Sequence, residues 1–93
     1  MIIVSQNKKN IINFNNICKI CVNKWNDKDF TVDCLDTTNF ESMLGEYKTE
    51  ERAKEILQEI IKFYEDTKQK MMLRNISLLN MDSFDFVYEM PKE

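Results

Sequence analysis

The chain has 93 residues, a formal net charge of −3, and only one glycine and one proline. A chain of this length has too few residues for a second hydrophobic core, so we expect a single domain over residues 1–93. The apolar run at residues 1–6 is too short for a signal peptide or a membrane span, which favours a soluble cytoplasmic protein. The negative charge disfavours nonspecific binding to a DNA backbone, which needs clustered lysines and arginines.

Four strands are predicted in the first half of the chain, joined by short polar turns. Strand-like patterns occupy residues 1–6, 11–22, 30–35 and 40–47, with an irregularity expected at Asn15 and Asn16. Because each connection is too short for a parallel crossover, the strands predict an antiparallel meander. Residues 84–90 alternate between apolar and polar side chains and predict a last strand, which Pro91 ends.

One strongly amphipathic helix is predicted between these strands. Thr49 is a suitable N-cap, and Glu50 and Glu51 place negative charge in the first turn, where the helix dipole favours it. The helix should run to about residue 66 or 70. Its apolar side chains recur at helical spacing and should form one buried stripe: Ala53, Ile56, Leu57, Ile60, Ile61, Phe63 and Tyr64. The expected fold is therefore α+β, an antiparallel four- or five-stranded sheet with this helix packed on one face.

The segment after the helix is too apolar for a free loop. It contains Met71, Met72, Leu73, Ile76, Leu78, Leu79 and Met81. A chain of this size cannot easily bury so many additional apolar side chains, and exposed apolar surface usually marks an interface. Residues 67–75 are basic whereas residues 82–93 are acidic, which would suit contacts between two copies. We therefore expect a homo-oligomer.

The chain lacks the residue patterns of most enzymes and metal sites. It has three cysteines and no histidine, one ligand short of a structural zinc site. Cys18 and Cys21 match a CxxC motif, but they lie in a strand-like run and not at a helix N-terminus, so they and Cys34 are interpreted as reduced apolar side chains. With Gly45 as the single glycine, a glycine-rich phosphate loop is excluded. We expect no enzymatic activity, no cofactor and no metal.

A nucleotide could still be held without catalysis, since its phosphates need cations and its base needs an aromatic plane. The basic segment and the few aromatic residues expected to be exposed supply five candidate ligand-binding residues: Arg74, Lys70, Trp25, Tyr47 and Tyr88. For Trp25, core packing and a ligand or partner contact are both open. A homo-oligomer would place additional arginines at a shared interface.

Four segments carry a recognisable pattern: MIIVSQ at residues 1–6, INFxNI at 12–17, LGEYKTEERAKEILQEI at 44–60 and YxMP at 88–91. The pattern resembles a family of small uncharacterised proteins of low-GC Gram-positive bacteria and their prophages. These motifs mark strands and the capped helix, so the resemblance carries over no catalytic residue.

The prophage resemblance implies a role against host defence in the host cytoplasm. In the leading interpretation, a homo-oligomer sequesters a nucleotide-derived immune signal, such as a cyclic ADP-ribose isomer or a cyclic oligonucleotide. The alternative is a protein-binding inhibitor of a host defence complex, similar to an anti-CRISPR, that acts through acidic residues such as Asp82, Asp85 and Glu89. A structural or adaptor domain without an anti-defence role is the third interpretation.

Overall fold

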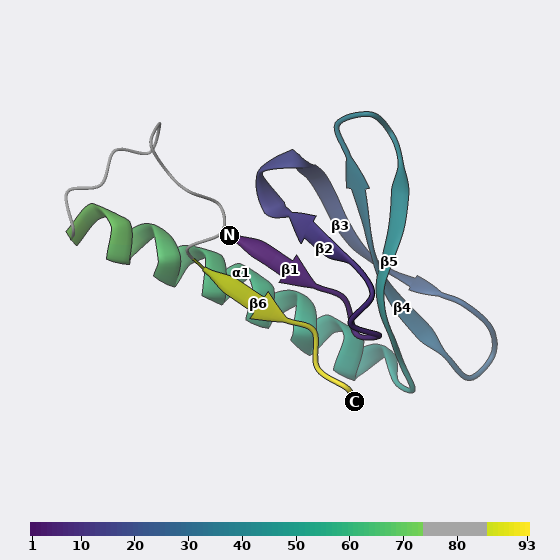
Figure 1. The fold of residues 1–93 in the computed structure, drawn as a ribbon. Helices are drawn as coiled ribbons and strands as arrows, with labels where there is room; N and C mark the ends of the chain where they lie inside the picture. Colours follow the sequence, from purple (N-terminus) through teal and green to yellow (C-terminus); the bar gives the residue numbers. More distant parts are fainter. Residues whose placement is uncertain (74–85) are drawn as a thin grey trace.

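The structure is a computed structural model that describes residues 1–73 and 86–93 (Figure 1). Within these residues the chain forms six strands and one long helix. They are β1 (Ile2–Val4), β2 (Ile11–Asn13), β3 (Ile17–Lys24), β4 (Phe30–Asp36), β5 (Glu41–Tyr47), α1 (Glu50–Leu73) and β6 (Val87–Glu89). A 3-10 turn, Phe14–Asn16, joins β2 to β3.

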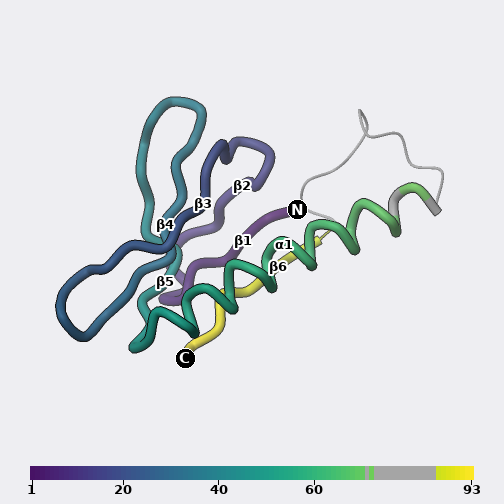
Figure 2. The backbone as a smooth tube through the Cα atoms, turned by 180° about the vertical axis from the view of Figure 1, so that it is seen from behind, coloured from purple at the N-terminus to yellow at the C-terminus, as the bar shows by residue number. Residues whose placement is uncertain are grey.

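The strands form two three-stranded sheets, in the orders β2–β1–β6 and β3–β4–β5. Pairing is antiparallel between β1 and β2 and throughout the second sheet. In contrast, β6 runs parallel to β1, with Ile3 opposite Tyr88. Figures 1 and 2 show α1 lying across one side of both sheets. The α+β class is therefore confirmed.

The single sheet expected from the sequence is divided in two, and the division falls at the irregularity expected at residues 15–16. The Asn13 side chain accepts a hydrogen bond from the Asn15 N–H at 3.0 Å, which caps the 3-10 turn and redirects the chain before β3. The expected antiparallel meander is thus interrupted between β2 and β3. The last strand, β6, pairs with β1 in parallel. The chain between these two strands contains all the other elements, so it is long enough for a parallel crossover.

The core lies between α1 and the two sheets. Ala53, Ile56 and Ile60 on the helix are at most 1% exposed. They belong to one buried cluster with Ile3 of the first sheet and Leu44 of the second. A single line of helix residues, three or four positions apart, therefore joins both sheets into one core.

The apolar stripe of α1 is wider than the core that covers it. The expectation that the whole stripe would be buried is wrong, because Ile61 is 44% exposed and three other members are only half-buried: Leu57, Phe63 and Tyr64. Thr67, which we did not assign to the stripe, is buried instead, and its hydroxyl donates to the Tyr64 carbonyl at 2.7 Å. The buried line thus continues along one edge of the stripe and leaves the other edge beside β3.

The start of α1 follows the sequence prediction. The Thr49 hydroxyl oxygen accepts the Arg52 N–H at 3.1 Å, as an N-cap does, and Lys54 pairs with Glu50 at 2.9 Å. The helix ends at Leu73, later than expected. In the part of the chain that the structure describes, no helix is both long and apolar enough to cross a membrane.

The β5 edge of the second sheet is closed by Gln6. The Gln6 backbone N–H donates to the Leu44 carbonyl at 2.8 Å. Its side-chain amide donates to the Glu46 carbonyl at 2.9 Å and accepts the Glu46 N–H at 2.8 Å. Gln6 therefore pairs with β5 much as a neighbouring strand would. The same amide nitrogen donates to the Lys92 carbonyl at 2.8 Å, which ties the segment after β6 to this edge.

Candidate functional site

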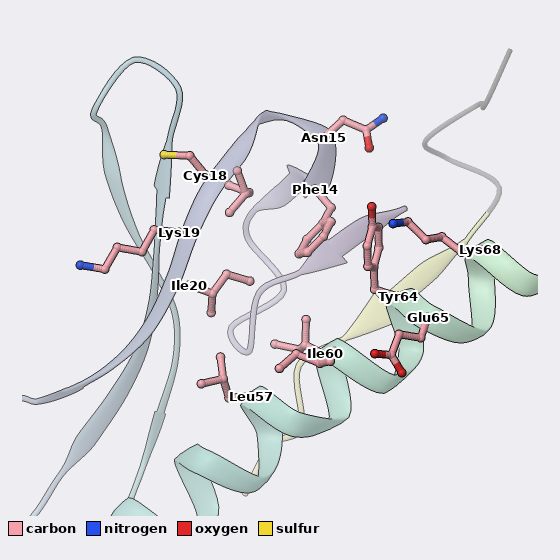
Figure 3. Close-up of a pocket in the computed structure, with 12 residues that line it drawn as sticks. Phe14, Asn15, Cys18, Lys19, Ile20, Leu57, Ile60, Tyr64, Glu65 and Lys68 are labelled. Atoms are coloured by element: carbon pink, nitrogen blue, oxygen red, sulfur yellow. The ribbon is translucent and has the colours of Figure 1, made fainter. Parts of the chain in front are cut away.

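An open groove with a volume of about 660 Å³ lies between α1 and β3 (Figure 3). Its apolar walls include Phe14, Ile17, Ile20, Leu57, Ile61 and Tyr64. In Figure 3 the side chains of Ile20, Leu57 and Ile60 point into the space between the strand and the helix. An apolar concave surface of this kind is a typical binding site.

One wall of the groove is the edge of β3. Within the described residues β3 pairs with β4 only. Four consecutive residues of β3, numbers 17–20, line the groove, so it borders the edge of the strand and not just one face, because successive side chains alternate between faces. None of the eight β3 side chains is fully buried, whereas four consecutive residues of β4, numbers 31–34, are. The β3 edge therefore presents backbone groups and apolar side chains together.

The opposite wall is an aromatic and aliphatic face of α1. The rings of Phe14 and Tyr64 contact each other with centroids 5.0 Å apart at 45°. The Lys68 ammonium lies 4.7 Å from the centroid of the Tyr64 ring. These contacts fix the upper end of the groove in Figure 3, and Leu57 and Ile61 extend the apolar surface toward the start of the helix.

The rim of the groove is more basic than the chain as a whole. Lys19 and Lys68 line it together with one acid, Glu65. Figure 3 shows the Lys19 side chain pointing away from α1. Among the described residues its ammonium forms no ion pair. A protein of net charge −3 therefore carries a locally cationic strand edge.

The candidate nucleotide ligands expected from the sequence are not gathered in one place. Lys70 is exposed in the last turn of α1, and Trp25 is 68% exposed in the loop between β3 and β4. Figures 1 and 2 place that loop and the end of α1 at opposite sides of the molecule. Arg74 lies outside the described residues, as do most of the apolar segment at 71–81 and the acids Asp82 and Asp85.

Tyr47 and Tyr88 have structural contacts that the sequence did not predict. Tyr47 is only 2% exposed, so the expectation of an exposed aromatic plane is wrong for this residue. Its hydroxyl donates to the Pro91 carbonyl at 2.8 Å, and burial raises its pKa to about 12. Tyr88 is half-buried against Phe63, and its hydroxyl donates to Glu59 at 3.0 Å. Burial and this hydrogen bond raise the pKa of Tyr88.

A second, smaller cavity of about 370 Å³ lies at the start of α1. Three cations line it, Lys48, Arg52 and Lys92, together with Glu46 and Glu93. Arg52 is already engaged, because its guanidinium contacts Glu55 at 3.1 Å and Glu59 at 3.4 Å. The two lysines are therefore the cations of this cavity that are more available for an anionic ligand.

The three cysteines are free thiols in the structure. Cys34 is buried, and burial together with the neighbouring Asp33 charge raises its pKa to about 11, which makes it less reactive. Cys18 is exposed, and its thiol lies 3.4 Å from the Leu35 and Asp36 carbonyls. In the described part of the chain, no three His, Cys, Asp or Glu side chains are placed to hold a metal ion.

The groove itself was not predicted from the sequence. Two signals could have indicated it: the helix stripe holds more apolar positions than one sheet covers, and β3 has apolar residues on both faces. Comparison of the chain with protein-family models, with curated proteins and with solved structures found no match.

Proposed function

We propose that this chain is a non-catalytic protein-binding protein that holds a segment of a partner protein in the groove between α1 and β3. The observation that carries the proposal is the apolar surface left open there, above all Ile61 at 44% exposed and the half-buried Leu57. Apolar side chains at the centre of a patch, with charged residues at its rim, are typical of protein interfaces. The rim here carries Lys19, Lys68 and Glu65.

The class of partner follows from the resemblance to prophage proteins. A small binding protein of that origin would meet host defence proteins in the host cytoplasm and would inhibit one of them by occupying a surface that it needs. The described residues with charge on the groove side are mainly basic, so the contact favours an acidic partner surface. This differs from the acidic inhibitor surface expected from the sequence, of which only Glu89 lies in the described residues.

The test is a matched pair of helix variants. Ile61→Asp places a charge in the groove, whereas Gln58→Asp introduces the same residue on the same helix at an exposed position that does not line it. The partner is identified by crosslinking to tagged chain in the host and is then purified. In titration calorimetry we expect Ile61→Asp to weaken binding at least tenfold, or about 1.4 kcal/mol, and Gln58→Asp to leave it unchanged. Equal binding by both variants, folded as judged by circular dichroism, would reject the groove.

Sequestration of a nucleotide-derived signal is the second candidate. The observation that favours it is the meeting of Lys48, Arg52 and Lys92 around the smaller cavity. Calorimetry against cyclic oligonucleotides and cyclic ADP-ribose isomers tests it, with the ligand recovered intact after heating. A variant with both Lys48→Gln and Lys92→Gln should lose binding, whereas Trp25→Ala should keep it. If none of these ligands gives a heat of binding, nucleotide sequestration is wrong.

A further inference from the structure

The two edges of the β3–β4–β5 sheet differ in what covers them. Gln6 pairs with the backbone of Glu46 on the β5 edge through both an N–H and a carbonyl. Within the described residues the β3 edge has no equivalent, because β3 pairs with β4 alone. An uncovered edge strand presents a row of backbone donors and acceptors that another strand can pair with.

The groove runs along this open edge. Residues 17–20 of β3 line it on one side and α1 lines it on the other. A strand added at the usual spacing of about 4.8 Å from β3 would therefore lie in the groove. Alternate side chains of that strand would face Leu57 and Ile61 on α1, and the others would point away from the helix, as Lys19 does in Figure 3.

The charges at the β3 edge favour one kind of added strand over another. Strand β3 contains Lys19 and Lys24 and no acid, and the Lys19 ammonium forms no ion pair in the described part of the molecule. Side chains directly opposite each other on neighbouring strands attract when their charges are opposite and repel when they are alike. A second copy of β3 would bring lysines together without an acid. An added strand with acidic residues on its outer face would neutralise Lys19.

We propose that the β3 edge accepts, by strand addition, an extended segment of a partner protein in which apolar residues alternate with acidic ones. The apolar residues face α1 across the groove, and the acidic residues lie beside Lys19 on the outer face of the sheet. The proposal rests on the proposed function of the groove and names the kind of segment that the groove holds. It does not depend on which protein supplies that segment.

The test uses capped octapeptides as probes. One alternates valine with glutamate, the second alternates valine with lysine, and the third has the composition of the first in blocks. The fourth and fifth are the first peptide with backbone nitrogens methylated either at its valines or at its glutamates. Binding to the full chain is measured by NMR titration, which also reports the residues affected. We expect the valine–glutamate peptide to shift the amides of residues 17–24 and to bind more tightly than the lysine peptide and the block peptide. One of the two methylated peptides should lose binding, because the N–H groups of alternate residues point to the same neighbouring strand.

Lys19→Glu tests the charge. The variant should bind the valine–glutamate peptide about tenfold more weakly and the valine–lysine peptide about tenfold more tightly, as expected for reversing one cross-strand charge pair with its neighbours. The affinity of Lys19→Gln for each of the two peptides should lie between that of the wild type and that of Lys19→Glu. Because Lys19 is exposed, the fold should be kept, and an unchanged amide spectrum away from β3 confirms this.

Different failures identify different errors. If the peptides shift only α1 residues, or if both methylated peptides bind as well as their parent, strand addition is wrong. If the valine–glutamate and valine–lysine peptides bind equally well to the wild type and to Lys19→Glu, the proposed acidic residues of the bound segment are wrong. In either case the purified partner would still lose affinity with Ile61→Asp, so the proposed function of the groove would stand. If that variant also leaves partner binding intact, the groove itself is wrong.

Discussion

At its β5 edge the second sheet is closed by Gln6, which bonds to the backbone at Leu44 and Glu46, whereas at its β3 edge the described chain supplies no further pairing. Among the residues that the structure describes, the same sheet therefore has one paired edge and one edge without a partner strand. Natural proteins usually cover or charge an exposed edge because it is a template for unwanted pairing. Here the open edge carries Lys19 and Lys24, whose like charges oppose pairing with a second copy of β3.

The helix shows the same contrast. Ile56 faces the core and is fully buried, while Ile61, five residues later, faces the groove beside β3 and is 44% exposed. Two isoleucines of one helix thus have different surroundings, since one packs in the core and the other lines the groove. An apolar stripe on a helix is therefore not evidence of burial along its whole width.

A charge should destabilise the fold most at Ile56 and far less at Ile61. Ile56→Asp buries a carboxylate without a partner and should cost more than about 4 kcal/mol, enough to unfold a domain of this size. Ile61→Asp should cost no more than about 1 kcal/mol, because the new carboxylate stays in contact with water. Urea unfolding followed by circular dichroism measures both. If the two variants lose similar amounts of unfolding free energy, Ile56 and Ile61 do not differ in the way that the core and the groove predict.

The next effect concerns the closed side of the molecule and depends on pH. Burial raises the pKa of Tyr47 from 10.0 to about 12. Its contribution to stability is therefore complete below pH 10 and is lost as the pH rises through about 12, because the unfolded state releases the proton first. The shift corresponds to about 2–3 kcal/mol.

Tyr47→Phe isolates this contribution. At neutral pH the variant should be less stable by about 1 kcal/mol, because it loses the hydrogen bond to the Pro91 carbonyl. Between pH 10 and 12 the wild type should lose more stability than the variant. Cys34, whose burial raises its pKa to about 11, titrates in both proteins and cancels in the difference. Parallel alkaline curves would contradict the burial of the Tyr47 hydroxyl.

Opening the closed edge should have a smaller effect on stability. Gln6→Ala removes the side-chain bonds to Glu46 and Lys92 and should cost about 1–2 kcal/mol, since water replaces part of the lost bonding at this half-buried site. It should also make the chain self-associate through β5, which light scattering detects. Gln6→Glu keeps the acceptor for the Glu46 N–H but sets a carboxylate oxygen against the Glu46 and Lys92 carbonyls, so it should be no more stable than Gln6→Ala. A Gln6→Ala chain that unfolds like the wild type would show that the edge is not closed by this residue.

Much of the fold follows from local pattern. The alternation within each strand, the Thr49 cap and the periodic apolar residues of the helix are properties of short segments, and they predict the elements and the α+β class. The division into two sheets depends on one capped turn at residues 13–15 and on pairing between β1 and β6, which are far apart in the sequence. Local alternation contains no information on such a partner.

The candidate site was predicted less well, because residue type does not determine position. Trp25, Lys70 and Tyr88 were chosen for the chemistry that a nucleotide needs, and the fold separates Trp25 from Lys70 and packs Tyr88 against Phe63. The groove depends instead on where the edge of a sheet meets the side of a helix. That position follows from sheet order, which becomes visible only in three dimensions.

The smallest effect on stability is expected at the open edge itself. Lys19→Val exchanges an exposed lysine for a residue that favours strands, so the free energy of unfolding should change by no more than about 0.5 kcal/mol. Its effect on assembly should be larger, because the repulsion that opposes pairing of two β3 edges is removed. Light scattering should then show self-association that rises with concentration beyond that of the wild type. Lys62→Val, at an exposed helix position outside the groove, is the control and should leave the mass distribution unchanged. If Lys19→Val behaves in the same way as the control, the β3 edge is not available for pairing, and the contrast between the two edges does not govern what the protein binds.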